Sequence, residues 1–324
     1  MYTTTKTMKF DVVLMNPPYS NRGTNQIHLR FVDKCLDIAD KQVTVMPFTF
    51  VTKTGFKKND KYKEKFSLEL IEVEEINSSV FEGTSMPNVG VYVFSKDKLN
   101  SEIKITNKDG DETIVDTLTA ISAFNSKEKE IVKYLESKGR QEMIGRLGHN
   151  PTTKQILRRQ GITDKNEVQE KIDTALLKSI SKIKHYFDDN KYALIVNVVN
   201  GGMNGQAISS KNGQIFDNFD DLKNFYFNRR VTNGYNVIIF DSKEAAENCK
   251  AALKRPLLRF TIYRTQEDQG MIIDKCYKYI PSIDWDKIKT DEDILIACGC
   301  DKDKAKEYVE YCKEVIDKVD KRWT

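Results

Sequence analysis

Four consecutive residues near the start of the chain, Asn16-Pro17-Pro18-Tyr19, have the types and spacing needed to activate an amine. Each proline fixes its backbone φ near about −65° and has no N–H donor, so the turn presents rigid carbonyl groups. The Asn16 amide oxygen and the Pro17 carbonyl oxygen are then two acceptors at a short, fixed separation. An exocyclic –NH2 group could donate a hydrogen to each, which would free its nitrogen lone pair to attack an electrophilic methyl group. Tyr19 would offer a face on which a purine stacks, a contact of roughly 1–3 kcal/mol.

The elements around this motif predict how it is positioned. The segment FDVVLM, residues 10–15, is an unalternated apolar run, which is typical of a strand buried on both faces. Further helical and strand patterns follow it in alternation, at 27–39, 42–48, 62–70 and 89–96. This order predicts an α/β fold with a doubly wound parallel sheet. Ligands bind such sheets beyond the carboxyl ends of the strands, which is where Asn16 and the segment Pro47-Phe48-Thr49 fall.

The strand followed by Asn-Pro-Pro-Tyr resembles the N6-adenine-specific DNA methyltransferases that carry an Asn/Asp-Pro-Pro-Tyr motif. The resemblance covers residues 8–96 well and the C-terminal half in part. It implies a Rossmann-like methyltransferase sheet, S-adenosylmethionine as cofactor and a target adenine flipped out of double-stranded DNA. It also implies that Asn16, Pro17, Pro18 and Tyr19 are catalytic, and that Phe48, Phe50 and Phe81 are candidate walls of the base pocket. The alternative interpretations are a tight turn that ends a strand and three aromatic residues of the core.

The cofactor half that the resemblance implies is not found in the sequence. The family places a Phe-x-Gly-x-Gly turn upstream of the catalytic strand, but here nine residues precede Phe10. The downstream segment VVNGGMNG, residues 198–205, lacks that spacing and is more typical of a hairpin turn or a DNA-contacting loop. No cofactor-binding residue is therefore assigned, and we expect S-adenosylmethionine binding to need more than this chain. Three explanations remain open: a second polypeptide carries the glycine-rich loop, the chain is a fragment of a longer enzyme, or it is a degenerate relative. Each predicts an unpaired apolar edge on residues 10–15.

The second half of the chain predicts a mixed α+β domain for DNA recognition. The segment FYFNRRVTNGYN carries Arg229 and Arg230, and KRPLLRFTIYRTQ carries Arg255, Arg259 and Arg264. Arginine suits phosphate and guanine contacts, and we expect these residues to lie on strands and loops that face DNA. The alternative is an ordinary solvated surface. The division expected is a catalytic half over 1–145 and a target-recognition domain over 146–324.

Composition sets limits on function. The 324 residues are 39% hydrophobic and 31% charged with a formal net charge of +4, which indicates a globular protein that tolerates an anionic partner. The sequence shows neither an apolar run long enough to span a membrane nor an apolar signal segment, so we expect a cytoplasmic protein. Six cysteines without a CxxC pair and three histidines give no reason to expect a metal site.

The sequence thus favours a site-specific adenine-N6 DNA methyltransferase, or its catalytic and target-recognition subunit, in a restriction–modification setting. The alternative is a catalytically inactive, methyltransferase-derived protein that binds DNA or a protein partner. A third hypothesis is methylation of another planar amide, such as a glutamine side chain in a protein, which uses the same motif. The basic residues of the C-terminal half favour nucleic acid over that substrate.

Overall fold

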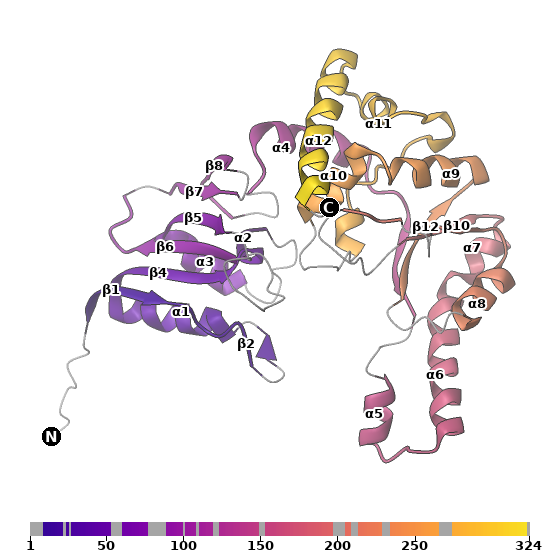
Figure 1. Cartoon of the computed structure of the whole chain (residues 1–324), viewed down its shortest axis with the longest axis horizontal. Coiled ribbons are helices and arrows are strands. Elements are labelled where there is room, and N and C mark those ends of the chain that lie inside the picture. Colours follow the sequence, from indigo (N-terminus) through magenta and orange to yellow (C-terminus); the bar gives the residue numbers. More distant parts are fainter. Residues whose placement is uncertain are drawn as a thin grey trace. The chain divides into compact units, whose positions relative to one another are not determined.

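The computed structural model divides into two compact units, Met1–Lys129 and Glu130–Thr324, and each is described here by itself (Figure 1). The structure describes residues 9–21, 24–25, 27–52, 60–76, 89–99, 101–107, 110–118, 123–148, 153–196, 205–208, 213–228, 234–265 and 274–322. Residues 143–147 form a strand of the second unit's sheet; the functional division expected at 145/146 stays a prediction.

A six-stranded mixed sheet forms the first unit. Its strand order is β1-β4-β6-β5-β7-β8, with the bounds β1 Phe10–Met15, β4 Ala39–Pro47, β5 Leu70–Ile76, β6 Val89–Ser95, β7 Ile103–Thr106 and β8 Glu112–Val115. The pairs β1–β4 and β5–β7 are parallel, whereas β6 runs antiparallel to both of its neighbours, β4 and β5. The expectation of a wholly parallel sheet was therefore wrong, because an apolar run such as VGVYVF does not encode the direction of its strand. The predicted α/β class is confirmed.

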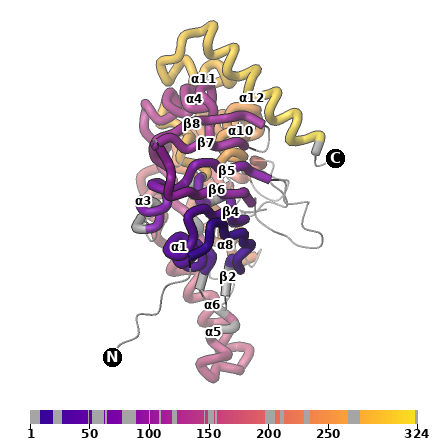
Figure 2. Tube along the Cα trace, turned by 90° about the vertical axis from the view of Figure 1, so that its left-hand side faces the viewer, coloured from indigo at the N-terminus to yellow at the C-terminus, as the bar shows by residue number. Residues whose placement is uncertain are grey.

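The helices of the first unit pack on one face of this sheet. They are α1 Ile27–Ile38, α2 Thr49–Thr52 and α3 Asp60–Glu69, and Figure 2 shows α1 and α3 on the same side of the strands. Leu29, Val32 and Leu36 project from α1 at helical spacing into a core that includes Phe66 of α3. Lys65 of α3 donates to Asp33 of α1 at 2.7 Å, which ties the two helices together at their rim. A two-stranded hairpin, β2 Ser20–Asn21 and β3 Thr24–Asn25, joins β1 to α1.

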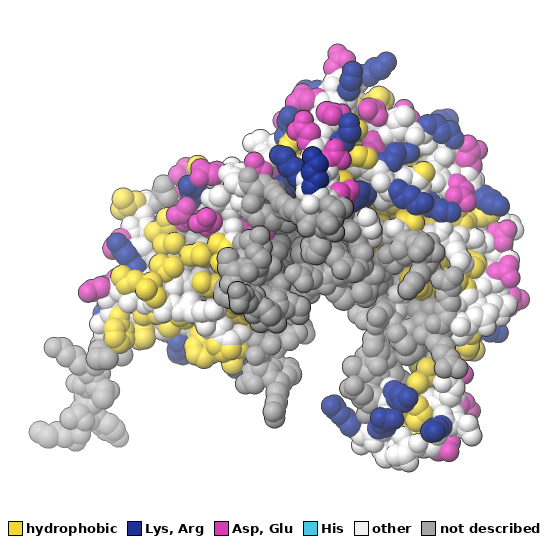
Figure 3. Space-filling model, viewed as in Figure 1, with side chains coloured by type: hydrophobic (Ala, Val, Ile, Leu, Met, Phe, Trp, Pro, Cys, Tyr) yellow, Lys and Arg dark blue, Asp and Glu magenta, His cyan; other side chains and the backbone are white. Residues whose placement is uncertain are grey.

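Strand β1 lies at the edge of the sheet and exposes one apolar face. Phe10, Val12 and Leu14 are 41%, 50% and 74% exposed, although the sequence pattern predicted burial on both faces. The reason is that, among the described residues, β1 pairs only with β4, and α1 and α3 cover only the opposite face. Hydrophobic side chains gather on this part of the first unit in Figure 3. The expected unpaired apolar edge is thus present in the described part of the chain.

A four-stranded antiparallel sheet organises the second unit. Its order is β11-β10-β12-β9, with the bounds β9 Met143–Leu147, β10 Tyr192–Val196, β11 Ile215–Phe216 and β12 Tyr235–Phe240. A second core forms where this sheet packs with α6 Lys165–Ile180, the 3-10 turn Ser181–Ile183, α7 Lys184–Asp188 and α8 Phe219–Asn228. The mixed α+β character predicted for this half is present.

The structure describes further helices between residues 126 and 322. They are α4 Ser126–Glu136, α5 Thr153–Arg159, α9 Lys243–Ala252, α10 Pro256–Thr265, α11 Asp291–Ala297 and α12 Lys302–Arg322, with 3-10 turns at Asp274–Tyr277 and Trp285–Lys287. Helix α10 corrects the expectation that KRPLLRFTIYRTQ lies on strands and loops. Pro256 occupies its first position, where a fixed φ and a missing N–H are tolerated. None of the described helices is long and apolar enough to cross a membrane.

Candidate active site

Three strand ends converge at one edge of the first sheet. Since β1 is parallel to β4, and β6 is antiparallel to both β4 and β5, the carboxyl ends of β1, β4 and β5 lie at the same edge. Asn16 follows β1 there, and Phe48 follows β4. The Thr44 hydroxyl donates to the Met15 carbonyl at 3.4 Å and holds the end of β1 against β4. The tertiary fold therefore brings together the two segments that the sequence placed at strand ends.

The motif itself presents an exposed amide on a partly buried turn. Asn16 and Pro18 are exposed, Pro17 is buried, and Tyr19 is half-buried against the core. The Tyr19 hydroxyl donates to Asn16 Oδ1 at 3.0 Å. An amide oxygen has two lone pairs, so this bond orients the Asn16 side chain and leaves it able to accept a second hydrogen.

Tyr19 is held in turn by a histidine that sequence reasoning missed. His28, in the first turn of α1, is 5% exposed, and its Nδ1 lies 3.3 Å from the Tyr19 carbonyl oxygen. The His28 ring meets the Tyr19 ring edge-on, with 5.8 Å between centroids. Burial raises the pKa of Tyr19 to about 12, so its phenol stays a protonated donor at neutral pH. The available signal was the position of His28 at the start of the helix that follows the motif.

A second layer of residues from β5 and β6 supports the same edge. The buried Tyr92 hydroxyl donates to the Pro47 carbonyl at 3.0 Å and fixes the end of β4. Burial raises the pKa of Tyr92 well above its usual value, and the nearby charges of Glu75 and Tyr19 act in the same direction. A side chain at Gly90 would put a Cβ 3.0 Å from the Phe48 ring, so glycine is needed for that ring to pack there. Gly90 and Tyr92 interrupt an otherwise apolar strand, which is the signal that could have identified them.

Two of the three predicted base-pocket aromatics are found in the core at this edge. Phe48 and Phe50 are each 4% exposed and belong to the first unit's hydrophobic core. The Phe50 ring packs against Phe66 and Tyr92, with centroid separations of 5.7 and 6.0 Å. A base-stacking role for either residue stays a prediction. Phe81 lies outside the described residues.

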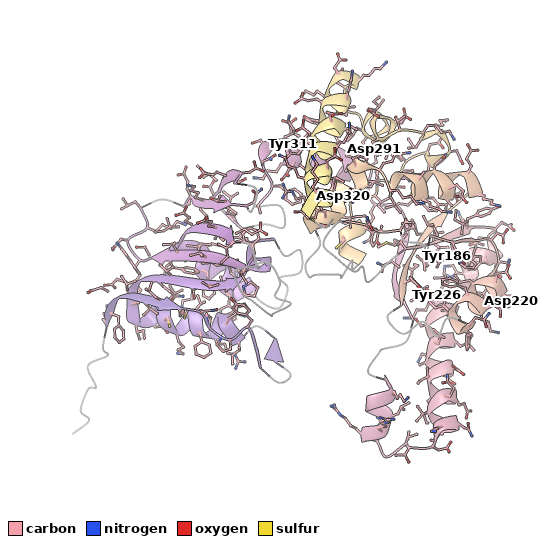
Figure 4. All side chains as sticks on the ribbon, viewed as in Figure 1. Tyr186, Asp220, Tyr226, Asp291, Tyr311 and Asp320 are labelled. Carbon is pink, nitrogen blue, oxygen red and sulfur yellow. The ribbon has the colours of Figure 1, made fainter. Side chains whose placement is uncertain are left out.

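Three of the predicted DNA-contacting arginines are engaged inside the second unit. Arg255 donates to the buried Asp291 at 2.8 Å, and Arg259 makes two bonds to Asp320, at 2.6 and 3.0 Å. Figure 4 labels both aspartates. The Arg264 guanidinium lies 5.8 and 5.7 Å from the ring centroids of Phe260 and Tyr263 on its own helix, α10. Contact of these arginines with DNA stays a prediction. Such contact would compete with the interactions that the arginines make inside the unit. Arg229 and Arg230 lie outside the described residues.

The described strand neighbours of Asn16 lie on one side of β1 only. In this part of the chain β1 has one strand neighbour, and no described strand carrying a glycine-rich turn lies on the other side of Asn16. Of the segment 198–205, only Gly205 is described. The same part of the chain contains no group of three or more His, Cys, Asp or Glu residues that could hold a metal ion. What the edge offers chemically is an exposed, oriented amide oxygen and an adjacent aromatic ring.

Comparison with known proteins gives partial structural matches. No protein-family model matches the chain, and no curated protein matches it. The methyltransferase subunit of a type I restriction–modification system from Streptococcus thermophilus is 17% identical with a TM-score of 0.28, over 33% of this chain and 27% of that one. The EcoKI M protein is 17% identical with a TM-score of 0.27, over 31% of this chain and 25% of that one.

A longer match is the type IIG restriction endonuclease BpuSI, which is 10% identical with a TM-score of 0.37 over 94% of this chain and 54% of that one. The chain therefore spans between about a quarter and about half of the length of these structures. Similarity at this level does not by itself assign an activity, so the functional interpretation depends on the geometry of the strand edge.

Proposed function

We propose that this chain provides the amine-binding part of an adenine-N6 DNA methyltransferase. The supporting observation is the exposed Asn16 amide at the carboxyl end of β1, with its oxygen oriented by the Tyr19 hydroxyl at 3.0 Å. Asn16 stands next to Pro17, whose backbone has a carbonyl acceptor but no N–H donor. A residue required only to end the strand would not need an oriented and exposed acceptor.

The chemistry of the edge follows from these acceptors. The N6 amine of a flipped adenine would donate one hydrogen to Asn16 Oδ1 and the other to the Pro17 carbonyl. Both bonds would draw the nitrogen lone pair out of conjugation with the ring and aim it away from the sheet. Tyr19 would stack on the purine, and its rigid support by His28 and the core would limit the cost of ordering the site. S-adenosylmethionine is the proposed source of the electrophilic methyl group.

The free edge of β1 is the proposed place for the missing cofactor half. A strand that pairs with β1 would satisfy its open backbone groups and cover Phe10, Val12 and Leu14. We propose that a second polypeptide supplies this strand together with a glycine-rich loop next to Asn16. Double-stranded DNA is the proposed substrate of the assembled enzyme, with the second unit, including Arg229 and Arg230, as its recognition part. We place the protein in the cytoplasm.

Substitution of Asn16 tests the proposal directly. In the full chain isolated with its native partners, Asn16→Ala should lower the rate of methyl transfer to adenine-containing DNA by about 10²–10³-fold, as loss of one preorganised hydrogen-bonding group does elsewhere. Asn16→Asp keeps an acceptor oxygen and should retain part of the activity. DNA affinity should stay unchanged in both variants, because Asn16 acts on the amine in the transition state.

Two outcomes would contradict the assignment. Equal losses of affinity and rate in Asn16→Ala would show that the residue serves DNA binding. A wild-type preparation that binds DNA and S-adenosylmethionine but transfers no methyl group would favour the alternative function, a catalytically inactive DNA-binding protein.

A further inference from the structure

Helix α5 in the second unit carries an uncompensated positive charge. Lys154, Arg158 and Arg159 are all exposed on this helix of seven residues. The sequence has no Asp or Glu between Glu142 and Asp164, although acidic residues are frequent elsewhere in the chain. Lys and Arg side chains gather over α5 and the adjoining part of α6 in Figure 3.

Three acidic residues that follow α5 in the chain, Asp164, Glu167 and Asp173, have other partners. Asp164 caps α6 by accepting from the backbone N–H groups of Asn166 and Glu167. The Glu167 carboxylate lies 3.8 Å from Lys171, and Asp173 accepts from the Gln169 amide at 2.7 Å. Among the described residues, the three cations of α5 form no ion pair. Since the three side chains are exposed, their charges face solvent.

The helix that carries these cations is firmly placed. At its end the Ile162 N–H donates to the Leu157 carbonyl and the Gly161 N–H to the Arg158 carbonyl, and Gly161 has a φ of +83°. This paired arrangement is a Schellman motif, which fixes the last turn. The Leu157 side chain is buried, so the cationic residues stand on an anchored helix.

The positions of these cations are not explained by a stabilising effect on the helix. A cation in the first turn of a helix is disfavoured by the helix dipole, yet Lys154 stands there and the first turn has no acidic residue. Lys154 and Arg158 are four residues apart and so lie on one face of the helix. The exposed side chains described on α5 are all cationic. Arginine also matches the geometry of phosphate oxygens.

We propose that α5 contacts the phosphate backbone of duplex DNA through Lys154, Arg158 and Arg159. The inference builds on the proposed function, because it names the surface that holds the substrate, but its test does not require methyl transfer. The contact is independent of base sequence, because phosphates carry no sequence information. It would position the duplex and add to the salt dependence of binding.

The test is DNA binding by the full chain across a range of salt concentrations. The triple variant Lys154→Gln, Arg158→Gln, Arg159→Gln should weaken binding to a labelled duplex of random sequence. The slope of log K against log salt should become shallower by about 2–3, since each lost phosphate contact in B-DNA contributes about 0.9. The matched control Lys302→Gln, Lys306→Gln, Lys318→Gln removes the same charge from exposed positions of α12, where acidic residues alternate with the lysines. This control should leave the slope nearly unchanged.

Several results would overturn the inference. It fails if the wild-type chain binds no duplex, if the triple variant keeps the wild-type slope, or if the control variant loses as much as the α5 variant. It also fails if the full chain binds polyglutamate through α5 as tightly as it binds DNA, because this would indicate an acidic protein partner instead. Should circular dichroism show that the triple variant has lost helix, the double variant Arg158→Gln, Arg159→Gln is measured in the same way, with an expected slope change of about 2. DNA binding through α5, in a preparation with the native partners that also binds S-adenosylmethionine but transfers no methyl group, would refute the proposed function and leave this inference standing.

Discussion

The position of Phe50 in the core leads to a quantitative prediction. Its side chain is 4% exposed, and its ring packs on Phe66 and Tyr92. Phe50→Ala removes a buried ring and leaves a cavity, a change that typically costs about 3–5 kcal/mol. The two lost aromatic contacts, each worth about 0.5–1.5 kcal/mol beyond burial, place the expected loss toward the upper part of that range. If the urea m-value is about 2 kcal/mol/M, the midpoint of unfolding should fall by roughly 1.5–2.5 M.

The assay is urea unfolding of the full chain followed by far-ultraviolet circular dichroism. Both tryptophans of the sequence lie in the second unit, so tryptophan fluorescence would not report on Phe50. Phe31→Ala is the matched control, because Phe31 is 44% exposed on α1 in the same unit and should cost less than about 1 kcal/mol. Phe50→Leu keeps more side-chain volume than Phe50→Ala and replaces it in the assay if the alanine variant does not fold.

The result that refutes this reasoning is equally specific. If Phe50→Ala unfolds within about 1 kcal/mol of the wild type, the ring is not a core element. A normal stability combined with weakened binding of adenine-containing DNA would then restore Phe50 as a wall of the base pocket. Equal losses in the Phe50 and Phe31 variants would mean that burial does not set the cost at either position.

Two further predictions concern the tyrosines of the strand edge. Tyr92→Phe leaves the buried Pro47 carbonyl without its donor, so unfolding free energy should fall by about 1–3 kcal/mol; an unchanged urea midpoint would show that the bond contributes nothing. Tyr19 should ionise near pH 12, in a spectrophotometric titration compared with Tyr19→Phe. Because its folded pKa is raised above the ordinary value of 10.0, its contribution to stability is complete below pH 10 and is lost as the pH rises toward 12; a transition near pH 10 would contradict burial of the phenol.

Much of the candidate site could be predicted from local sequence. The apolar run at residues 10–15 forms a strand, the prolines end it, and the helical pattern that follows forms α1. The hairpin of β7 and β8 and the turn at Gly299 between the last two helices also follow from short-range signals. These features depend on backbone geometry and on periodicity within a few residues, which the order of residue types specifies directly.

The tertiary structure alone decided which faces are covered and which charges are used. The FDVVLM strand looks buried from its composition, yet one face is open, because burial depends on what packs against a strand and not on the strand itself. Arg255 and Arg259 resemble a DNA-binding surface in sequence, but their carboxylate partners come from residues 36 and 61 positions away. The three cations of α5 differ from them only in what surrounds them: no described carboxylate pairs with them. Pairings over such distances arise from chain topology. Local residue patterns therefore could not reveal which cations form ion pairs inside the fold and which remain available to a ligand.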